Sequence, residues 1–220
     1  MESNTGPVAG ARDSRSQSIK LGLLNTRSVR HKAAVIHDIV RDEKRDIIAL
    51  MKTWVRGDDP TNAVKLDVAP PGYMSDTNHV TCGGGVAVIC RDTLKMSTAF
   101  DFSSTEFESL AVSVKTKSMP VLIVCVYRPS GPVTSALCNA LADLFDQLLL
   151  LTQRFVVCGN FNVPSNDDSS VDPQVDSLLS RYNLVQHVHR PTHKAGNLLD
   201  LVITADSDYQ SVTGMSSDRR

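Results

Sequence analysis

The fold of this chain is constrained above all by a series of short apolar runs, separated by polar segments and by stretches with helical spacing. Several of these runs are apolar at consecutive positions, a pattern typical of central strands that are covered on both faces. Strands are therefore predicted at residues 19–24, 47–50, 86–90, 110–114, 121–127, 155–158 and 199–204. Helices are predicted around residues 33–40, 136–151 and 175–182. Together these elements predict an α/β fold in which helices sandwich two sheets.

Length and charge limit the organisation of the chain. With 220 residues, of which 41% are hydrophobic, it has enough apolar side chains for one substantial core. Residues 1–18 contain almost no large apolar groups, so we predict a flexible leader there and a single domain over residues 19–220. The formal net charge of −1 provides no global basic field, so binding of nucleic acid would need a local positive patch.

The cysteines and the apolar stretches indicate a cellular environment. The cysteines are odd in number and scattered, mostly within apolar runs: Cys82, Cys90, Cys125, Cys138 and Cys158. This pattern predicts buried thiols in a reducing compartment, with no disulfide partner. No apolar stretch is long enough to span a bilayer, and the N-terminus lacks the apolar core of a secretory signal. We therefore expect an intracellular protein, nuclear or cytoplasmic, without a membrane partner.

A set of short motifs occurs in order along nearly the whole chain. The motifs are Leu24-Asn25-Thr26-Arg27-Ser28, Ala49-Leu50-Met51-Lys52-Thr53-Trp54, Gly83-Gly84-Gly85, Phe107-Glu108, Val126-Tyr127-Arg128-Pro129, Gly159-Asn160-Phe161-Asn162, Pro191-Thr192-His193, Leu199-Asp200-Leu201 and Ser217-Asp218-Arg219. Each motif alone is weak evidence, but the ordered set is specific. It resembles the endonuclease/exonuclease/phosphatase superfamily, and in particular the apurinic-type endonuclease domain of LINE (non-LTR) retrotransposons.

The resemblance implies a four-layer α/β/β/α sandwich of two packed mixed sheets. In that architecture the active site lies at one end, where strand ends converge. Polar residues follow apolar runs by a residue or two in the way this requires: Asn25, Lys52, Tyr127, Asn160 and Asn162. The chain stops just after Ser217-Asp218-Arg219, where the family continues into a last strand, so we expect a C-terminally truncated domain that lacks this strand.

The family chemistry is hydrolysis of a phosphodiester bond with Mg²⁺ held by oxygen ligands. The resemblance implies that the principal metal ligand is a glutamate at the position of Lys52, that Asp218 contributes nearby and that Asn25 helps to arrange the ligands. A lysine ammonium at position 52 repels a divalent cation. We therefore expect Mg²⁺ to be the cofactor of the family and its binding to be weakened in this chain.

Two further positions depart from the family pattern. Asn160 stands where an aspartate orients or deprotonates the attacking water, and an amide cannot act as a base. Arg219 stands where a histidine, held by an aspartate that matches Asp200, contacts the phosphate. Arginine is always protonated, so Arg219 can bind a phosphate but cannot transfer a proton.

Other positions keep the family residue and are predicted to contact the phosphate or to support residues that do: Asn25, Tyr127, Asn162, Asp200 and Asp218, with Arg128 and Thr192 assigned to substrate binding. Each has a structural alternative. Tyr127, Arg128 and Pro129 can form only a strand end and a turn, and Asn25 and Asn162 can stabilise their own turns. As an ordered set, these residues favour an inherited site.

The sequence therefore predicts a LINE-type DNA endonuclease domain with impaired or lost nicking activity and DNA as its partner. One alternative is a Mg²⁺-dependent endonuclease with residual activity, in which Asp218 or Asp200 holds the ion. Another is a nucleic-acid-binding or protein-interaction module on the same fold.

Overall fold

The computed structural model describes residues 19–30, 32–55, 68–78, 84–117, 119–164 and 170–205, which form two β-sheets and their covering helices. The four-stranded sheet has the order β1 (Leu21–Asn25), β2 (Ile47–Met51), β4 (Val86–Arg91) and β3 (Tyr73–Thr77). Strands β1 and β2 are parallel and are connected through helix α1 (Ala33–Asp42), whereas the β2–β4 and β4–β3 pairs are antiparallel.

The six-stranded sheet has the order β5 (Met96–Phe100), β6 (Glu108–Val114), β7 (Val121–Tyr127), β8 (Phe155–Asn160), β10 (Asp200–Thr204) and β9 (Val185–Gln186). Only the β7–β8 pair is parallel among its described pairs, and helix α3 (Ser135–Leu151) connects these two strands. Helix α4 (Pro173–Arg181) follows β8 in the chain. Both sheets are therefore mixed, as predicted.

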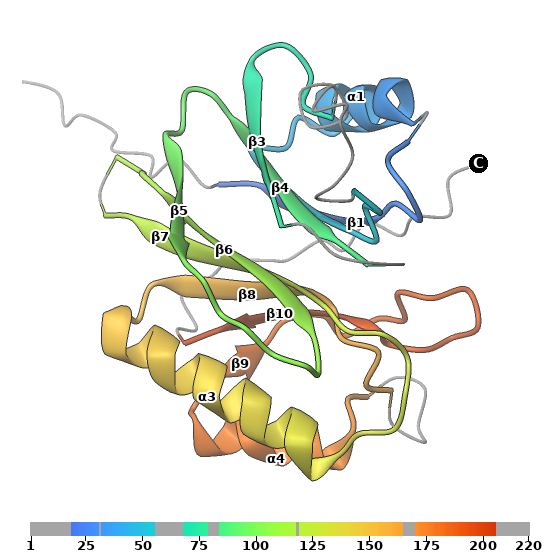
Figure 1. Cartoon of the computed structure of the whole chain (residues 1–220), viewed down its shortest axis with the longest axis vertical. Coiled ribbons are helices and arrows are strands. Elements are labelled where there is room, and N and C mark those ends of the chain that lie inside the picture. Colours follow the sequence, from blue (N-terminus) through green and yellow to red (C-terminus); the bar gives the residue numbers. More distant parts are fainter. Residues whose placement is uncertain are drawn as a thin grey trace, which may run out of the picture.

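The elements stack in the layer order helix, sheet, sheet, helix (Figure 1). Strand β2 shows how side chains that point alternately to the two faces of a sheet produce these layers. Ile48 and Leu50 pack with Ile36 of α1, whereas Ala49 packs in the core between the two sheets. Successive strand side chains point to opposite faces, so an uninterrupted apolar strand can serve both layers. The predicted α/β/β/α sandwich is confirmed.

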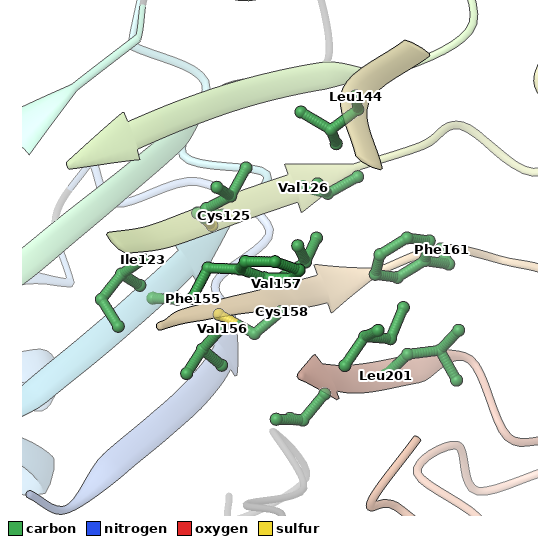
Figure 2. Close-up of a cluster of buried hydrophobic side chains, with 14 of the residues drawn as sticks. Ile123, Cys125, Val126, Leu144, Phe155, Val156, Val157, Cys158, Phe161 and Leu201 are labelled. Carbon is green, nitrogen blue, oxygen red and sulfur yellow. The ribbon is translucent and has the colours of Figure 1, made fainter. Parts of the chain in front are cut away.

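The larger core surrounds β7 and β8, in which every residue is buried. Figure 2 shows Ile123 and Val126 of β7, Phe155 of β8 and Leu201 of β10 gathered with Leu144 of α3. Burial of side chains of this size stabilises a fold by about 1.5–3 kcal/mol each. This core holds the ends of β7 and β8 at fixed positions.

The strands that escaped sequence prediction lie at or near sheet edges. Strand β5 is mostly exposed, β3 is only partly buried along its length, and β9 contains two residues. Among the described strands, each of these three has a neighbour on one side only, and such edge strands need no continuous apolar run. The predicted leader at residues 1–18 and the expected loss of a last strand after Ser217-Asp218-Arg219 fall outside the described residues. Within the described ranges, no helix has both the length and the apolar character that crossing a membrane requires.

Candidate functional site

A row of polar side chains crosses one end of the six-stranded sheet. Glu108 is paired with Tyr127, Tyr127 with Asn160, and Asn160 with Asp200. Strands β6 and β10 run antiparallel to β7 and β8. The first residues of β6 and β10 therefore lie beside the last residues of β7 and β8. Strand pairing therefore brings together four chemically active groups from four separate parts of the sequence.

The four-stranded sheet contributes Asn25 and Lys52 to the same end of the molecule. Asn25 is the last residue of β1 and pairs with Met51, which Lys52 follows directly. The Lys52 Nζ atom lies 5.3 Å from the centroid of the Tyr127 ring, close enough for a cation–π contact. This contact joins the two sheets, and it places a positive side chain beside the polar row.

Asn160 is buried and connects its neighbours through both ends of its side-chain amide. Its Nδ2 donates to Asp200 Oδ1 over 2.7 Å, and its Oδ1 accepts from Asn162 Nδ2 over 2.7 Å. Asn162 Nδ2 also donates to the backbone oxygen of Arg128. These partners determine the orientation of both amides, because only an NH₂ group can donate to a carboxylate or a carbonyl.

The Arg128 guanidinium points inward and is only 5% exposed. Its Nη1 donates to the backbone oxygen of Asn162 over 2.8 Å, and its Nη2 donates to the backbone oxygens of Gly131 (3.1 Å) and Pro132 (2.5 Å). These bonds hold the segment after β7 against the segment after β8. They give Arg128 a scaffold role in this structure, and its contact with substrate stays a prediction.

Thr192 lies in the loop before β10 and fixes the beginning of that strand. Its Oγ1 accepts from the backbone nitrogens of Leu199 (3.1 Å) and Asp200 (3.0 Å). A side-chain hydrogen bond between Thr192 and Asp200 also favours the charged carboxylate. Thr192 therefore positions Asp200, and its predicted contact with substrate is untested.

The pKa of Lys52 and the pKa of Asp200 both differ from their ordinary values. Burial raises the pKa of Asp200, and hydrogen bonds from Asn160 and Thr192 together with the Lys52 and His193 charges oppose this rise. Burial and the Arg27 charge lower the pKa of Lys52, whereas the Asp200 charge opposes that fall. Lys52 and Asp200 thus stabilise each other's charged form.

Gly159 is required by the close approach of β8 to β7. Its φ of +144° is strained for any residue with a side chain, and an added Cβ would collide with the backbone oxygen of Val126. The residue before Asn160 must therefore be glycine if the two strands are to pair up to their ends. This gives a backbone reason for the first position of the Gly159-Asn160-Phe161-Asn162 motif.

Glu108 is a member of the polar row that the sequence prediction did not assign to the site. Its Oε2 accepts from the backbone nitrogen of Gly85 over 2.5 Å, and a Cβ on Gly84 would collide with its carboxylate. Burial raises the pKa of Glu108, and burial together with the Glu108 charge raises the pKa of Tyr127. Two features of the sequence could have identified Glu108 as a site residue: its carboxylate stands at the start of an apolar strand, and a run of glycines leaves space for that carboxylate.

The described residues do not fit a hard divalent cation. They contain no group of three or more His, Cys, Asp or Glu side chains with suitable spacing. The positive charge of Lys52 interacts with the charge of Asp200, and the Asn160 oxygen already accepts a hydrogen bond. The buried Asn25 Oδ1 has no hydrogen-bond partner among the described residues, but one amide oxygen cannot replace the carboxylates that such an ion prefers. Asp218 and Arg219, predicted as site residues, lie outside the described residues.

Comparison with solved structures identifies similar folds among DNA-processing enzymes. The endonuclease domain of TRAS1, a telomere-specific non-LTR retrotransposon, aligns with a TM-score of 0.64 and 13% identity over 86% of this chain and 85% of that one. The AP endonuclease LMAP from Leishmania major aligns with a TM-score of 0.65 and 12% identity over 85% and 79%. A 3′ phosphatase from Neisseria bound to a product DNA hairpin aligns with a TM-score of 0.61 and 16% identity over 86% and 87%.

At these identities the structural likeness establishes the fold alone. A search of curated proteins finds no match. The sequence itself matches the Endonuclease/Exonuclease/phosphatase family over residues 21–214, which is most of the chain. With the two mixed sheets and the polar row at their converging ends, this match shows that the chain belongs to the endonuclease/exonuclease/phosphatase family.

Proposed function

We propose that this chain is an endonuclease-fold domain of the retrotransposon type that binds the phosphate backbone of DNA but hydrolyses it weakly or not at all. One observation carries the proposal. The Lys52 ammonium lies over the Tyr127 ring and interacts with the Asp200 charge, at the position where the resemblance puts the metal-binding glutamate. A positively charged side chain therefore occupies the position at which the resemblance implies a carboxylate that binds the metal ion.

Loss of metal affinity follows from electrostatics. A divalent ion about 4 Å from a unit positive charge is repelled by roughly 8 kcal/mol at an effective dielectric constant near 20. Asn160 adds a second obstacle, because its amide is not a base and both of its polar ends are engaged by Asp200 and Asn162. Lys52 therefore weakens metal binding, and Asn160 cannot take a proton from a water molecule at this site.

Binding of phosphate, in contrast, is supported by the same charges. Lys52 and Arg27 are close enough for the Arg27 charge to lower the pKa of Lys52, so two positive groups lie near each other at this end of the fold. An ammonium offers three hydrogen-bond donors and is a common ligand of phosphate oxygens in proteins. A phosphate between these cations would relieve their mutual repulsion.

The hydrolytic part is tested by nicking of supercoiled plasmid with Mg²⁺ and with Mn²⁺. We expect little or no nicking by the native chain, and clear nicking by the triple variant Lys52→Glu, Asn160→Asp and Arg219→His. Adding Asp200→Ala to the triple variant should abolish nicking, which excludes a contaminating nuclease. Nicking by the native chain at the rate of the triple variant contradicts the proposal. Absence of nicking activity in a folded triple variant contradicts the assignment of the site residues.

The binding part is tested by fluorescence anisotropy of labelled DNA at several salt concentrations. Affinity should fall with added salt, and Lys52→Ala should weaken binding and reduce the salt slope by about 1. Lys117→Ala is the matched control, because Lys117 is exposed in the turn between β6 and β7, at the opposite end from Glu108 and Tyr127. Salt-independent affinity, or equal effects of the two substitutions, contradicts phosphate binding at Lys52.

A further inference from the structure

Trp54 is a large apolar side chain that stands next to the candidate site and is 51% exposed. It is the only tryptophan in the chain. It lies two residues after Lys52, in the segment that leaves the end of β2. Single exposed apolar residues are common on protein surfaces, so exposure alone gives Trp54 no role. Its backbone and its neighbours provide the further evidence.

The backbone around Trp54 is held in an unfavourable conformation. Both Lys52 and Trp54 have φ of 56°, in the left-handed region that bulky residues rarely adopt. Such strain persists only where surrounding contacts over-determine it, and it gathers at binding and catalytic sites. At Trp54 the strain is located beside the site and not in an ordinary surface turn.

Hydrogen bonds on both sides of the segment supply those contacts. The backbone oxygen of Lys52 accepts from the Ser28 nitrogen over 2.7 Å, and the Trp54 nitrogen donates to the Gly84 oxygen over 2.8 Å. Thr53, between them, is buried at 1% exposure. The segment therefore directs Thr53 inward and presents Lys52 and Trp54 from a fixed backbone, so little order has to be gained when a ligand binds.

Positive charge lies close to Trp54 along the chain, because Lys52 stands two residues before it. Lys52 and Arg27 are coupled electrostatically, and Ser28, the neighbour of Arg27, bonds the Lys52 backbone. An aromatic face next to cationic groups is the combination by which proteins bind single-stranded nucleic acid, with bases stacked on the ring and phosphates on the cations. A base inside a duplex has both faces covered by its neighbours, so only an unpaired base can stack on a protein ring.

From this juxtaposition we infer that Trp54 is a stacking platform for an unpaired nucleobase of the DNA strand whose phosphate contacts Lys52. The inference rests on the proposed function, because it takes the phosphate at Lys52 as given and adds the base. It identifies the preferred ligand as single-stranded or locally unpaired DNA. It also assigns Trp54 a binding role separate from hydrolysis.

Intrinsic fluorescence tests the inference, because the sole tryptophan reports from the site itself. The native chain is titrated with oligothymidylate, with an oligomer of abasic tetrahydrofuran phosphates of equal length, and with a blunt duplex. We expect oligothymidylate to quench Trp54 and to bind about 5- to 150-fold more tightly than the abasic oligomer. The abasic oligomer and the duplex should bind without comparable quenching.

Variants separate stacking from general damage to the site. Trp54→Ala should bind oligothymidylate and the abasic oligomer with equal affinity, whereas Trp54→Phe should keep part of the preference. Circular dichroism confirms that each variant is folded. Leu150→Ala, a change at a residue that is 87% exposed near the end of α3, is the control and should leave both affinities unchanged.

The outcomes distinguish the two proposals. Equal affinity of the native chain for the base-containing and abasic oligomers overturns the stacking role and leaves phosphate binding standing. The stacking role is also overturned if Trp54→Ala weakens binding of both oligomers equally, because the residue would then only support the loop. Failure of the native chain to bind either oligomer overturns both the inference and the proposed function.

Discussion

Asn160 Nδ2 donates a hydrogen bond of 2.7 Å to Asp200 Oδ1 and so ties the end of β8 to the beginning of β10. The donor and acceptor of this bond are fixed, because the Asn160 oxygen already accepts from Asn162 and only the NH₂ group remains to interact with Asp200. Asp200 is therefore kept as an anion partly by an amide donor. A carboxylate at position 160 would face it with a second negative charge.

This relationship predicts the effect of Asn160→Asp on its own. Without the NH₂ donor, two largely buried carboxylates face each other, and we expect the free energy of unfolding at pH 7.5 to fall by about 1–3 kcal/mol. The pair takes up a proton in the folded state, so the loss should shrink as pH is lowered towards about 4. Urea denaturation at pH 5 and pH 7.5 measures both effects.

Asn160→Ala is the control for that change. It removes the same hydrogen bond without adding a charge, so its destabilisation should vary less between the two pH values. An Asn160→Asp protein as stable as the native chain at pH 7.5 would show that Asp200 does not depend on the amide donor.

Asp200→Asn should alter the pH dependence of stability. Burial raises the folded pKa of Asp200, so the native state holds this proton more firmly than the unfolded chain, and stability falls as pH rises from about 4 through the folded pKa. The variant keeps an oxygen to accept from Asn160 but has no charge to desolvate. Relative to the native chain it should gain stability between pH 4 and pH 7, measured by chemical denaturation. Asp143→Asn, at an exposed position on α3, is the control, and parallel pH profiles for native and Asp200→Asn proteins would refute the expectation.

Gly159→Ala should be among the most damaging small substitutions in the described chain. The added methyl group would collide with the Val126 backbone oxygen at a φ of +144°, so β7 and β8 would have to separate at the site. We expect a loss of more than about 3 kcal/mol in the free energy of unfolding. Gly72→Ala is a matched control, because Gly72 also has a positive φ, +86°, but nothing lies within 4 Å of an added Cβ.

Gly72→Ala should lower the free energy of unfolding by only about 1–2 kcal/mol, because the left-handed backbone conformation is the only source of strain at this position. Similar losses for the two variants, measured by urea denaturation, would mean that the contact with Val126 does not limit the packing of the strands.

The thiols in the core should resist modification. Burial raises the pKa of Cys90 to about 11 and that of Cys158 to about 12, and it raises the pKa of Cys125 well above its ordinary value. A Cys82→Ser and Cys138→Ser variant should therefore not react with a disulfide-exchange reagent at pH 8 while folded. All remaining thiols should react after denaturation, and rapid labelling of the folded variant would contradict the burial of these strands.

The central strands could be predicted from sequence because burial on both faces leaves a continuous apolar run. Strands β7 and β8 and helix α3 carry this signature, and the prediction of two sandwiched sheets is confirmed by their arrangement. Strand β5 escaped prediction because an edge strand buries few side chains, and its backbone pairing with β6 leaves no apolar pattern in the sequence.

The sequence by itself also determined that polar residues such as Lys52, Tyr127 and Asn160 follow apolar runs and so stand at strand ends. Only the tertiary structure decided which of them meet. Packing of the two sheets brings Lys52 over Tyr127, and strand register brings Asn160 to Asp200 across 40 positions of sequence. Only the fold could turn the Arg128 guanidinium towards backbone carbonyls, because buried carbonyl oxygens must find donors and sequence does not reveal which oxygens are buried.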